Sequence, residues 1–208
     1  MAGAGEIVVT AQSRSQNLQD APLSITAVNS DMLEARGQTS IAQVAAQAPN
    51  VNLQEAPATY GPSVQAFIRG VGQSDSSFAL EPGVGLYVDD VYYSTLQGSM
   101  LDMLDLDRVE ILRGPQGTLA GQNSIGGAIK LYSKKPNGDD GGFVQTTYGS
   151  FNRAEMRGGA NFTIVPDHLF ARISVTGVQK DGYVTRYDYR CTHPDSPVRS
   201  FQVSKGCK

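Results

Sequence analysis

The chain has 208 residues, which is long enough for one or two domains with a sizeable core. Its net charge of −3 gives no bulk attraction to nucleic acid, and its Lys and Arg residues form no basic stripe. With 23 glycines and only 18% charged residues, the composition favours strands and turns over helices, and no apolar run is long enough for a membrane-spanning helix.

The chain begins with a short apolar run that favours an extended conformation, Glu6-Ile7-Val8-Val9-Thr10-Ala11, followed by a polar stretch up to Gln19. An extended terminal segment carries free N–H and C=O groups, which can add as a strand to the edge of another protein's sheet. Two interpretations are open here: a first strand of the globular domain, or a segment that pairs with a partner.

A strand over residues 22–28 and two short helices are predicted next. Asn29, Ser30 and Asp31 are N-cap candidates for a helix over residues 32–36, which Gly37 ends. Ser40 and Gln43 form a capping-box pair for a second helix, which Pro49 ends. The apolar residues of this helix share one face, so both helices are predicted to pack in the core.

Strands are predicted from residue 51, over residues 64–69 and over residues 86–91. Ser74 and Asp75 lie in the loop-like stretch after the second of these strands, and Tyr92 and Tyr93 follow the third. Loops that join rigid strands often carry binding groups, so these four residues are candidates for ligand contact. The alternative is that the tyrosines are ordinary exposed loop residues.

Residues 104–136 combine two predicted strands with a glycine-rich connection. Val109, Ile111 and Leu112 alternate with or adjoin the charged residues Arg108, Glu110 and Arg113. Buried charges are tolerated when they are paired, so these side chains need partners. The connection contains five glycines, which permit positive φ angles and close backbone approach, and a second strand follows over residues 128–133.

After Pro136, a polar hinge at residues 137–142 leads into long alternating strands over residues 152–164 and 169–177. In the first of these, one face carries Ala154, Met156, Gly158, Ala160, Phe162 and Ile164, and the other carries Arg153, Glu155, Arg157, Gly159, Asn161 and Thr163. Strands of about ten residues with one apolar face are typical of a membrane β-barrel wall. A soluble sandwich has the same period of two, but its core would not accept these charges.

Several segments together resemble the signature regions of TonB-dependent receptors, the active transporters of Gram-negative outer membranes. The matching segments are Phe67–Gly70 ("IRG"), Tyr87–Asp90 ("YVDG"), Arg108–Leu119 and Gly126–Ile129. The resemblance covers nearly the whole chain. It implies an α+β plug domain with a small mixed β-sheet and short helices, followed by the first antiparallel strands of a transmembrane β-barrel.

The resemblance also implies a division of the chain. Residues 1–13 would be the TonB-box segment, residues 14–136 the plug, residues 137–142 the hinge, and residues 143–208 the first barrel strands and an extracellular loop. The location would be the outer membrane, with the plug facing the periplasm. Because barrels of this kind close roughly 22 strands, we expect the sequence to be an N-terminal fragment.

Roles for individual residues follow from the same resemblance. Glu6, Ile7, Val8, Val9, Thr10 and Ala11 would bind TonB, which an inner-membrane complex energises. Arg69 and Arg113 would pair with glutamates on the barrel wall. Arg108 and Glu110 would join this plug–barrel charge network, with local pairing inside the plug as the alternative. The other partners would be a scarce small nutrient, such as an iron–siderophore complex, and outer-membrane lipid.

The two cysteines, Cys191 and Cys207, both lie in the polar last segment, which would be the extracellular loop. In an exported protein these cysteines would readily be oxidised to a disulfide, which would stabilise the fold by about 3 kcal/mol. A metal site is the weaker alternative, because His193 has no second cysteine or histidine at zinc-ligand spacing.

No nucleophile–base–acid set, cofactor motif or metal motif is recognisable in the sequence, so we expect no enzymatic activity and no cofactor. The main alternative to a transporter is a soluble periplasmic or surface binding module that uses a plug-like domain without transport.

Overall fold

The computed structural model describes residues 8–10, 16–38, 40–55, 63–75, 80–94, 105–121 and 123–182. These residues divide between two compact units, one within residues 1–142 and 159–174 and the other within residues 143–158 and 175–208. Across the described ranges, no helix combines the length and the hydropathy that a bilayer crossing requires.

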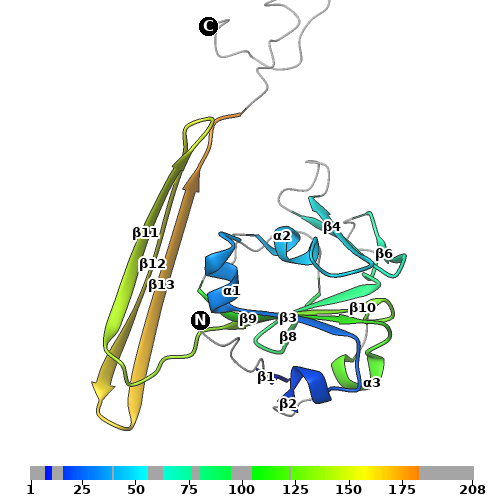
Figure 1. Ribbon diagram of the computed structural model, residues 1–208, viewed down its shortest axis with the longest axis horizontal. Helices are drawn as coiled ribbons and strands as arrows, with labels where there is room; N and C mark the ends of the chain where they lie inside the picture. The colour runs from blue at the N-terminus through cyan, green and yellow to red at the C-terminus, as the bar shows by residue number, and fades with distance from the viewer. Residues whose placement is uncertain are drawn as a thin grey trace, which may run out of the picture. The chain divides into compact units, whose positions relative to one another are not determined.

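A mixed five-stranded sheet forms the centre of the first unit (Figure 1). Its strands, in order across the sheet, are β3 (Ile25–Asn29), β9 (Leu106–Arg113), β10 (Gly127–Ser133), β7 (Val84–Val88) and β8 (Val91–Tyr93). β10 pairs in parallel with β7, and the other neighbouring strands are antiparallel. The two strands predicted on either side of the glycine-rich connection are therefore direct neighbours in this sheet.

One face of the sheet packs on two short helices and on a small antiparallel sheet (Figure 1). The helices are α1 (Ser30–Ala35) and α2 (Ile41–Ala45), and the small sheet consists of β4 (Val51–Glu55), β5 (Val64–Ile68) and β6 (Val71–Gln73). Ile111 and Ile129 from the central strands lie in one buried apolar cluster with Ile41 and Ile68. This cluster is the main core.

The helix caps follow the predicted pattern. The Asn29 side chain accepts a hydrogen bond from Met32 N at 3.0 Å, so α1 begins at Ser30, two residues before the predicted start. α2 begins after Ser40, whose backbone N–H donates to the Gln43 side chain at 3.2 Å to complete the capping box. Local polar groups therefore determine where both helices begin.

The opposite face of the sheet is covered by the N-terminal segment (Figure 1). β1 (Val8–Val9) pairs antiparallel with β2 (Gln16–Asn17), and the 3₁₀ turn η1 (Leu18–Asp20) follows. The short helix α3 (Gly117–Ala120) lies within the glycine-rich connection. The polar stretch up to Gln19 therefore ends in regular structure.

Gly127 shows why the connection before β10 needs glycine. Its φ angle is +151°, and a Cβ at this position would lie 2.2 Å from the Leu112 carbonyl oxygen. A side chain at this position would push the Leu112 carbonyl oxygen away. It would therefore separate β10 from β9 at the first pair of their ladder, Gly127 with Arg113.

A second sheet contains β11 (Gly141–Gly149), β12 (Arg153–Val165) and β13 (Leu169–Gln179) in that order, with strand directions that alternate (Figure 1). The polarity of β12 is the reverse of that in a soluble protein. Met156, Phe162 and Ile164 are 57%, 47% and 59% exposed, whereas Glu155 is only 5% exposed.

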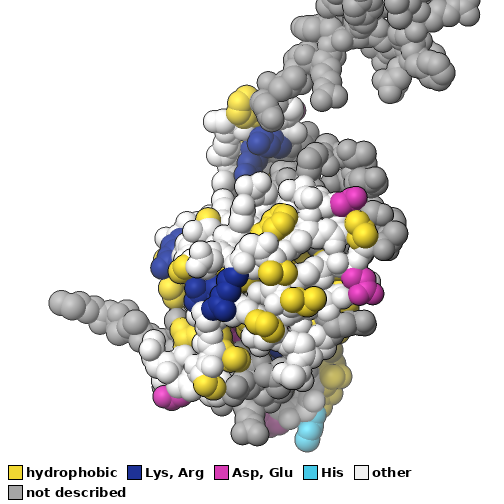
Figure 2. Space-filling view, turned by 90° about the vertical axis from the view of Figure 1, so that its right-hand side faces the viewer, with side chains coloured by type: hydrophobic (Ala, Val, Ile, Leu, Met, Phe, Trp, Pro, Cys, Tyr) yellow, Lys and Arg dark blue, Asp and Glu magenta, His cyan; other side chains and the backbone are white. Residues whose placement is uncertain are grey.

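Elsewhere on the surface, hydrophobic side chains occur mainly as separate spots among polar groups, as on the face in Figure 2. Isolated apolar side chains are normal on a soluble surface, whereas the successive apolar positions of β12 are not.

We predict that Ile111→Ala lowers the free energy of unfolding by about 2–5 kcal/mol, because Ile111 is fully buried and truncation leaves a cavity in the main core. Chemical denaturation of the chain in detergent measures this change. Ile125→Ala is the matched control, since Ile125 is 69% exposed and its truncation leaves no cavity. Equal losses in the two variants would contradict the assignment of the core.

Candidate functional site

The N-terminal segment is attached to the sheet through a buried ion pair. Glu110 on β9 is completely buried, and its Oε1 accepts hydrogen bonds from Arg108 Nε at 2.8 Å and from Thr10 N at 2.9 Å. Arg108 also donates from Nη2 to Thr10 Oγ1 at 2.8 Å. The preceding residue, Val9, is fully buried. We call Thr10, Arg108 and Glu110 the N-terminal latch.

The latch continues into a row of polar side chains on the same face of the sheet. Tyr132 is the register partner of Arg108, and the Arg108 guanidinium lies 3.9 Å from the centre of the Tyr132 ring. The Tyr132 hydroxyl donates to Asp90 Oδ1 at 2.9 Å, and Lys130 Nζ lies 3.2 Å from the same oxygen. Asp90 belongs to the turn between β7 and β8, so the row joins this turn to the N-terminal segment.

The protonation states of this row follow from burial and pairing. Burial alone would lower the pKa of Arg108, but hydrogen bonds to Glu110 and Asp107 outweigh it and raise the pKa, so the guanidinium stays charged. Burial would raise the pKa of Asp90, but hydrogen bonds from Tyr132 and Lys130 lower it. Burial raises the pKa of Tyr132 well above its ordinary value, so this hydroxyl stays a donor.

The two arginines of the motif segments, Arg69 and Arg113, lie close together in the fold. A Cβ placed on Gly114 would be 2.9 Å from Arg69 Nη1, so the glycine after Arg113 makes room for the Arg69 side chain. Arg113 Nη1 donates to the Pro49 carbonyl at 3.3 Å. Within the described part of the chain, neither arginine forms a salt bridge, and their pairing with a barrel wall stays a prediction.

Arg108 and Glu110 pair with each other, which is the local arrangement that the sequence left open. Whether they also belong to a plug–barrel charge network is not tested by this pair, so that part of their role stays a prediction.

Sequence analysis missed a second buried ion pair. Both carboxylate oxygens of Asp105 accept hydrogen bonds from Arg172, at 2.5 and 2.6 Å, and the Ser174 hydroxyl donates to the same carboxylate. These residues lie 67 and 69 positions apart in the sequence. No local pattern in the sequence joins positions so distant.

The candidate ligand-contact residues make contacts with different parts of the fold. The Ser74 carbonyl accepts from Gln65 Nε2 at 2.8 Å, and Asp75 follows it after β6. The Tyr92 hydroxyl accepts from Asn123 Nδ2 at 2.8 Å, whereas Tyr93 packs against the main core. A role in ligand contact stays a prediction for all four residues.

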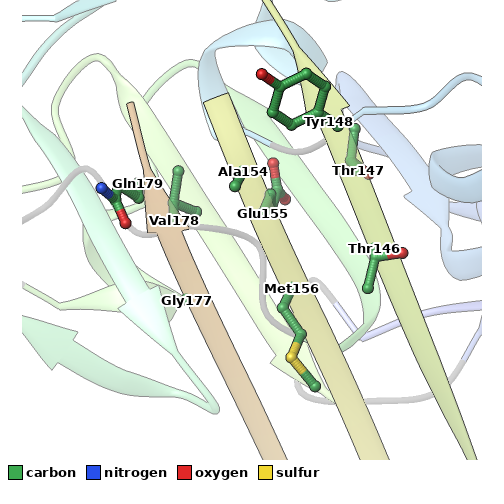
Figure 3. A pocket seen from close by; sticks show the side chains of 9 residues that line it. All are labelled: Thr146, Thr147, Tyr148, Ala154, Glu155, Met156, Gly177, Val178 and Gln179. Atoms are coloured by element: carbon green, nitrogen blue, oxygen red, sulfur yellow. The ribbon is translucent and has the colours of Figure 1, made fainter. Parts of the chain in front are cut away.

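A shallow hollow lies at one end of the second sheet, between the end of β11, the start of β12 and the end of β13 (Figure 3). Its lining includes Tyr148, Glu155, Met156 and Gln179. Glu155 is held by Arg153 at 2.7 Å and Arg157 at 2.5 Å, so its charge is already neutralised. Among the described residues, no three His, Cys, Asp or Glu side chains are arranged to hold a metal ion.

Some of the predicted site residues lie outside the described ranges. They are Glu6, Ile7, Ala11, Cys191 and Cys207.

The TonB-dependent Receptor Plug Domain family model matches residues 17–128, which is more than half of the chain. The chain belongs to this family. The match covers the five-stranded sheet almost completely, from β3 to the start of β10. The plug fold with its mixed sheet and few helices is therefore confirmed.

Similar proteins include the pesticin receptor of Yersinia pestis, which is 30% identical over 143 residues, or 67% of this chain and 20% of the receptor. The ferrioxamine B receptor of Salmonella typhimurium is 28% identical over 134 residues, covering 64% of this chain and 18% of the receptor. The chain thus spans about a fifth of the length of these relatives.

Solved structures of receptors share the fold of the chain. The ferric yersiniabactin uptake receptor FyuA from Yersinia pestis superposes with a TM-score of 0.69 at 24% identity, covering 81% of this chain and 26% of that chain. The pyoverdine outer membrane receptor FpvA from Pseudomonas aeruginosa also gives 0.69, at 21% identity and with 88% and 26% coverage.

We predict that the stability difference between the chain and its Asp90→Asn variant decreases on acidification. Folding lowers the pKa of Asp90, so its carboxylate stabilises the fold at pH values above its ordinary pKa of 3.8. This stabilisation is lost as the pH falls through the lowered pKa. Denaturation at a series of pH values, from roughly pH 6 to pH 2, measures the difference. A difference that grows on acidification would contradict the assigned direction.

Proposed function

We propose that the chain is the plug and the first barrel strands of a receptor that imports a scarce nutrient across the Gram-negative outer membrane, using energy delivered by TonB. The observation that carries the proposal is the short extended strand Val8–Val9 near the N-terminus, attached to the plug by the hydrogen bonds of Thr10 and the buried side chain of Val9. So short an attachment separates more easily than the main core, and this strand is therefore suited to leave the plug and pair with a partner's sheet edge.

The substrate class follows from the relatives. Receptors for ferrioxamine B and for ferric yersiniabactin are among the proteins that resemble this chain, and an iron-regulated outer membrane virulence protein of Vibrio cholerae is 27% identical over 164 residues. We therefore propose an iron–siderophore complex or a similar small ligand. Ser74, Asp75, Tyr92 and Tyr93 are the candidate residues for its contact.

The second sheet supports a location in the outer membrane. Its exposed positions on β12 are apolar, and its covered positions include the ion-paired Glu155. Lipid outside and a polar, plugged lumen inside would require this arrangement. In this assignment, residues 1–13 form the TonB-box segment, residues 14–136 the plug, residues 137–142 the hinge, and residues 143–208 the first barrel strands with an extracellular loop closed by a Cys191–Cys207 disulfide.

Plug–barrel contacts complete the proposal. Arg69 and Arg113 lie next to each other without a salt bridge in the described residues, and acidic groups of the barrel wall would supply their partners. In the proposed transport, the receptor binds its ligand, moves its plug and releases the ligand, and no covalent bond is made or broken.

We predict that Val8→Pro abolishes nutrient uptake by the full-length receptor and leaves ligand binding intact. Proline removes a backbone N–H and cannot join a strand ladder at this position. Uptake of labelled ligand by cells, compared with binding to cells whose membrane is de-energised, measures the two effects. Val8→Ala is the control, since it shortens an exposed side chain but keeps the N–H. Normal uptake by Val8→Pro would remove the coupling role from this strand.

A second pair of variants tests the membrane assignment. We predict that Phe162→Arg reduces insertion of the full-length receptor into the outer membrane, because an arginine on the lipid face is unfavourable, by about 2–4 kcal/mol at the bilayer midplane and by less towards its edges. Thr163→Arg, on the opposite face of β12, inserts normally. The amount of heat-modifiable, folded receptor in isolated outer membranes is the readout. If Thr163→Arg reduced insertion more than Phe162→Arg, the assignment of the lipid-facing and inward-facing sides of β12 would be wrong.

A further inference from the structure

We propose that Asp105 is a positioning residue that clamps the plug to the β12–β13 hairpin and, through Asn161, holds the hinge at residues 137–142 against bending. We call Asp105, Arg172 and Ser174 the hairpin clamp. The clamp, Asn161 and the hinge all belong to the first compact unit. This role rests on the proposed receptor function, and it assigns the residues that determine where the plug is held on the first strands of the wall.

The clamp contacts β13 at two positions. Asp105 lies immediately before β9, and its two carboxylate oxygens accept hydrogen bonds from Arg172 at 2.5 and 2.6 Å. The Ser174 hydroxyl donates to the same carboxylate. Arg172 and Ser174 share one face of β13, because alternate residues of a strand point to the same side. Two parallel hydrogen bonds from one guanidinium fix the orientation of the contact as well as its distance.

Burial makes the clamp difficult to open. The side chains of Asp105 and Arg172 are only 4% and 12% exposed. Loss of either partner would leave a charge buried without compensation, which is far more unfavourable than loss of an exposed ion pair. The Asp105 carbonyl also accepts from Lys134 N at 3.0 Å, so the same residue fixes the chain where it leaves β10 for the hinge.

A side-chain amide joins the clamp to the hinge. Arg172 Nη1 donates to Asn161 Oδ1 at 2.8 Å, and Asn161 Nδ2 donates to Asn137 Oδ1 at 2.6 Å. Asn161 lies on β12, and Asn137 is the first residue of the hinge. A carboxamide offers both an acceptor and a donor, so Asn161 connects the clamp and the hinge through its two ends.

The rest of the hinge also contacts the hairpin. Asp140 Oδ1 accepts from the Thr163 backbone N–H at 2.7 Å, and the Gly138 carbonyl accepts from the Thr163 hydroxyl at 3.4 Å. A Cβ placed on Gly138 would lie 3.3 Å from the ring of Phe170 on β13. Bending of the hinge therefore requires that contacts with both strands of the hairpin break.

Two spin labels on the full-length receptor test the clamp, with no ligand or partner protein present. They are attached through Val91→Cys on the plug and Asp167→Cys at the hairpin turn, both exposed positions, with Cys191→Ser and Cys207→Ser to avoid other labelling. We expect Asp105→Asn to broaden the distribution of distances between the labels roughly twofold, because the buried ion pair is lost. An unchanged distribution overturns the proposal.

Asp107→Asn is the matched control, because it makes the same change two residues away. The Asp107 side chain is 52% exposed and pairs with Arg108 inside the plug, so the parental distribution should be kept. Equal broadening by Asp107→Asn would indicate a general loss of order around β9 and overturn the proposal. Asp105→Asn combined with Arg172→Gln should broaden the distribution no more than Asp105→Asn alone, since both changes remove one contact. Additive broadening would contradict direct pairing.

The connection to the hinge is tested by amide hydrogen exchange at Thr163, whose N–H donates to Asp140. We expect Asn161→Ala to speed this exchange roughly threefold, because the hinge loses a hydrogen bond to β12. The distances between the spin labels should stay narrow, since the Asp105–Arg172 pair remains. Unchanged exchange at Thr163 overturns the holding of the hinge through Asn161.

Uptake is measured separately, with radiolabelled ferric hydroxamate and ferric catecholate siderophores. If the label distances and the exchange change as expected but the parental receptor takes up none of these complexes, the clamp is supported and the proposed siderophore uptake fails. If uptake occurs but the distances are insensitive to Asp105→Asn, the receptor function stands and the clamp fails.

Discussion

The plug depends on how it accommodates one buried carboxylate. Glu110 lies on an inner strand of the sheet with no exposure to water, and such a group is tolerated only with charged and hydrogen-bonded partners. Arg108 supplies the charge from two residues away, and Thr10 supplies the backbone N–H from about a hundred residues away. The N-terminal segment is therefore attached through the same carboxylate that the sheet must neutralise.

The five-stranded sheet has two faces with different roles. Its apolar face packs on α1, α2 and the β4–β6 sheet, and this core maintains the fold. Its other face carries paired charges and a smaller apolar cluster, formed by Tyr87, Leu112 and Ala128, under a thin N-terminal cover. Apolar burial resists separation over its whole area, whereas polar contacts exchange readily for contacts with water. One sheet therefore combines a large apolar core on one face with a smaller, partly polar attachment on the other.

Local signals in the sequence predicted most of the elements. Side-chain caps located α1 and α2, and strict alternation identified β12 and β13 with their faces. Sequence could not give the partners of the charges, because Thr10–Glu110 and Asp105–Arg172 are contacts between distant positions. It also missed β2 and α3, which are too short for any periodic pattern.

The order of strands across the sheet has a mechanical consequence. β3, which follows the N-terminal segment in the chain, is an edge strand, whereas β9 and β10 are each held by neighbours on both sides. Tension applied at Val8 would first meet the two-pair ladder with β2 and the hydrogen bonds of Thr10, and then the single ladder that joins β3 to β9. The plug would thus yield stepwise from its N-terminal end, with its most strongly bonded strands the last to bear the load.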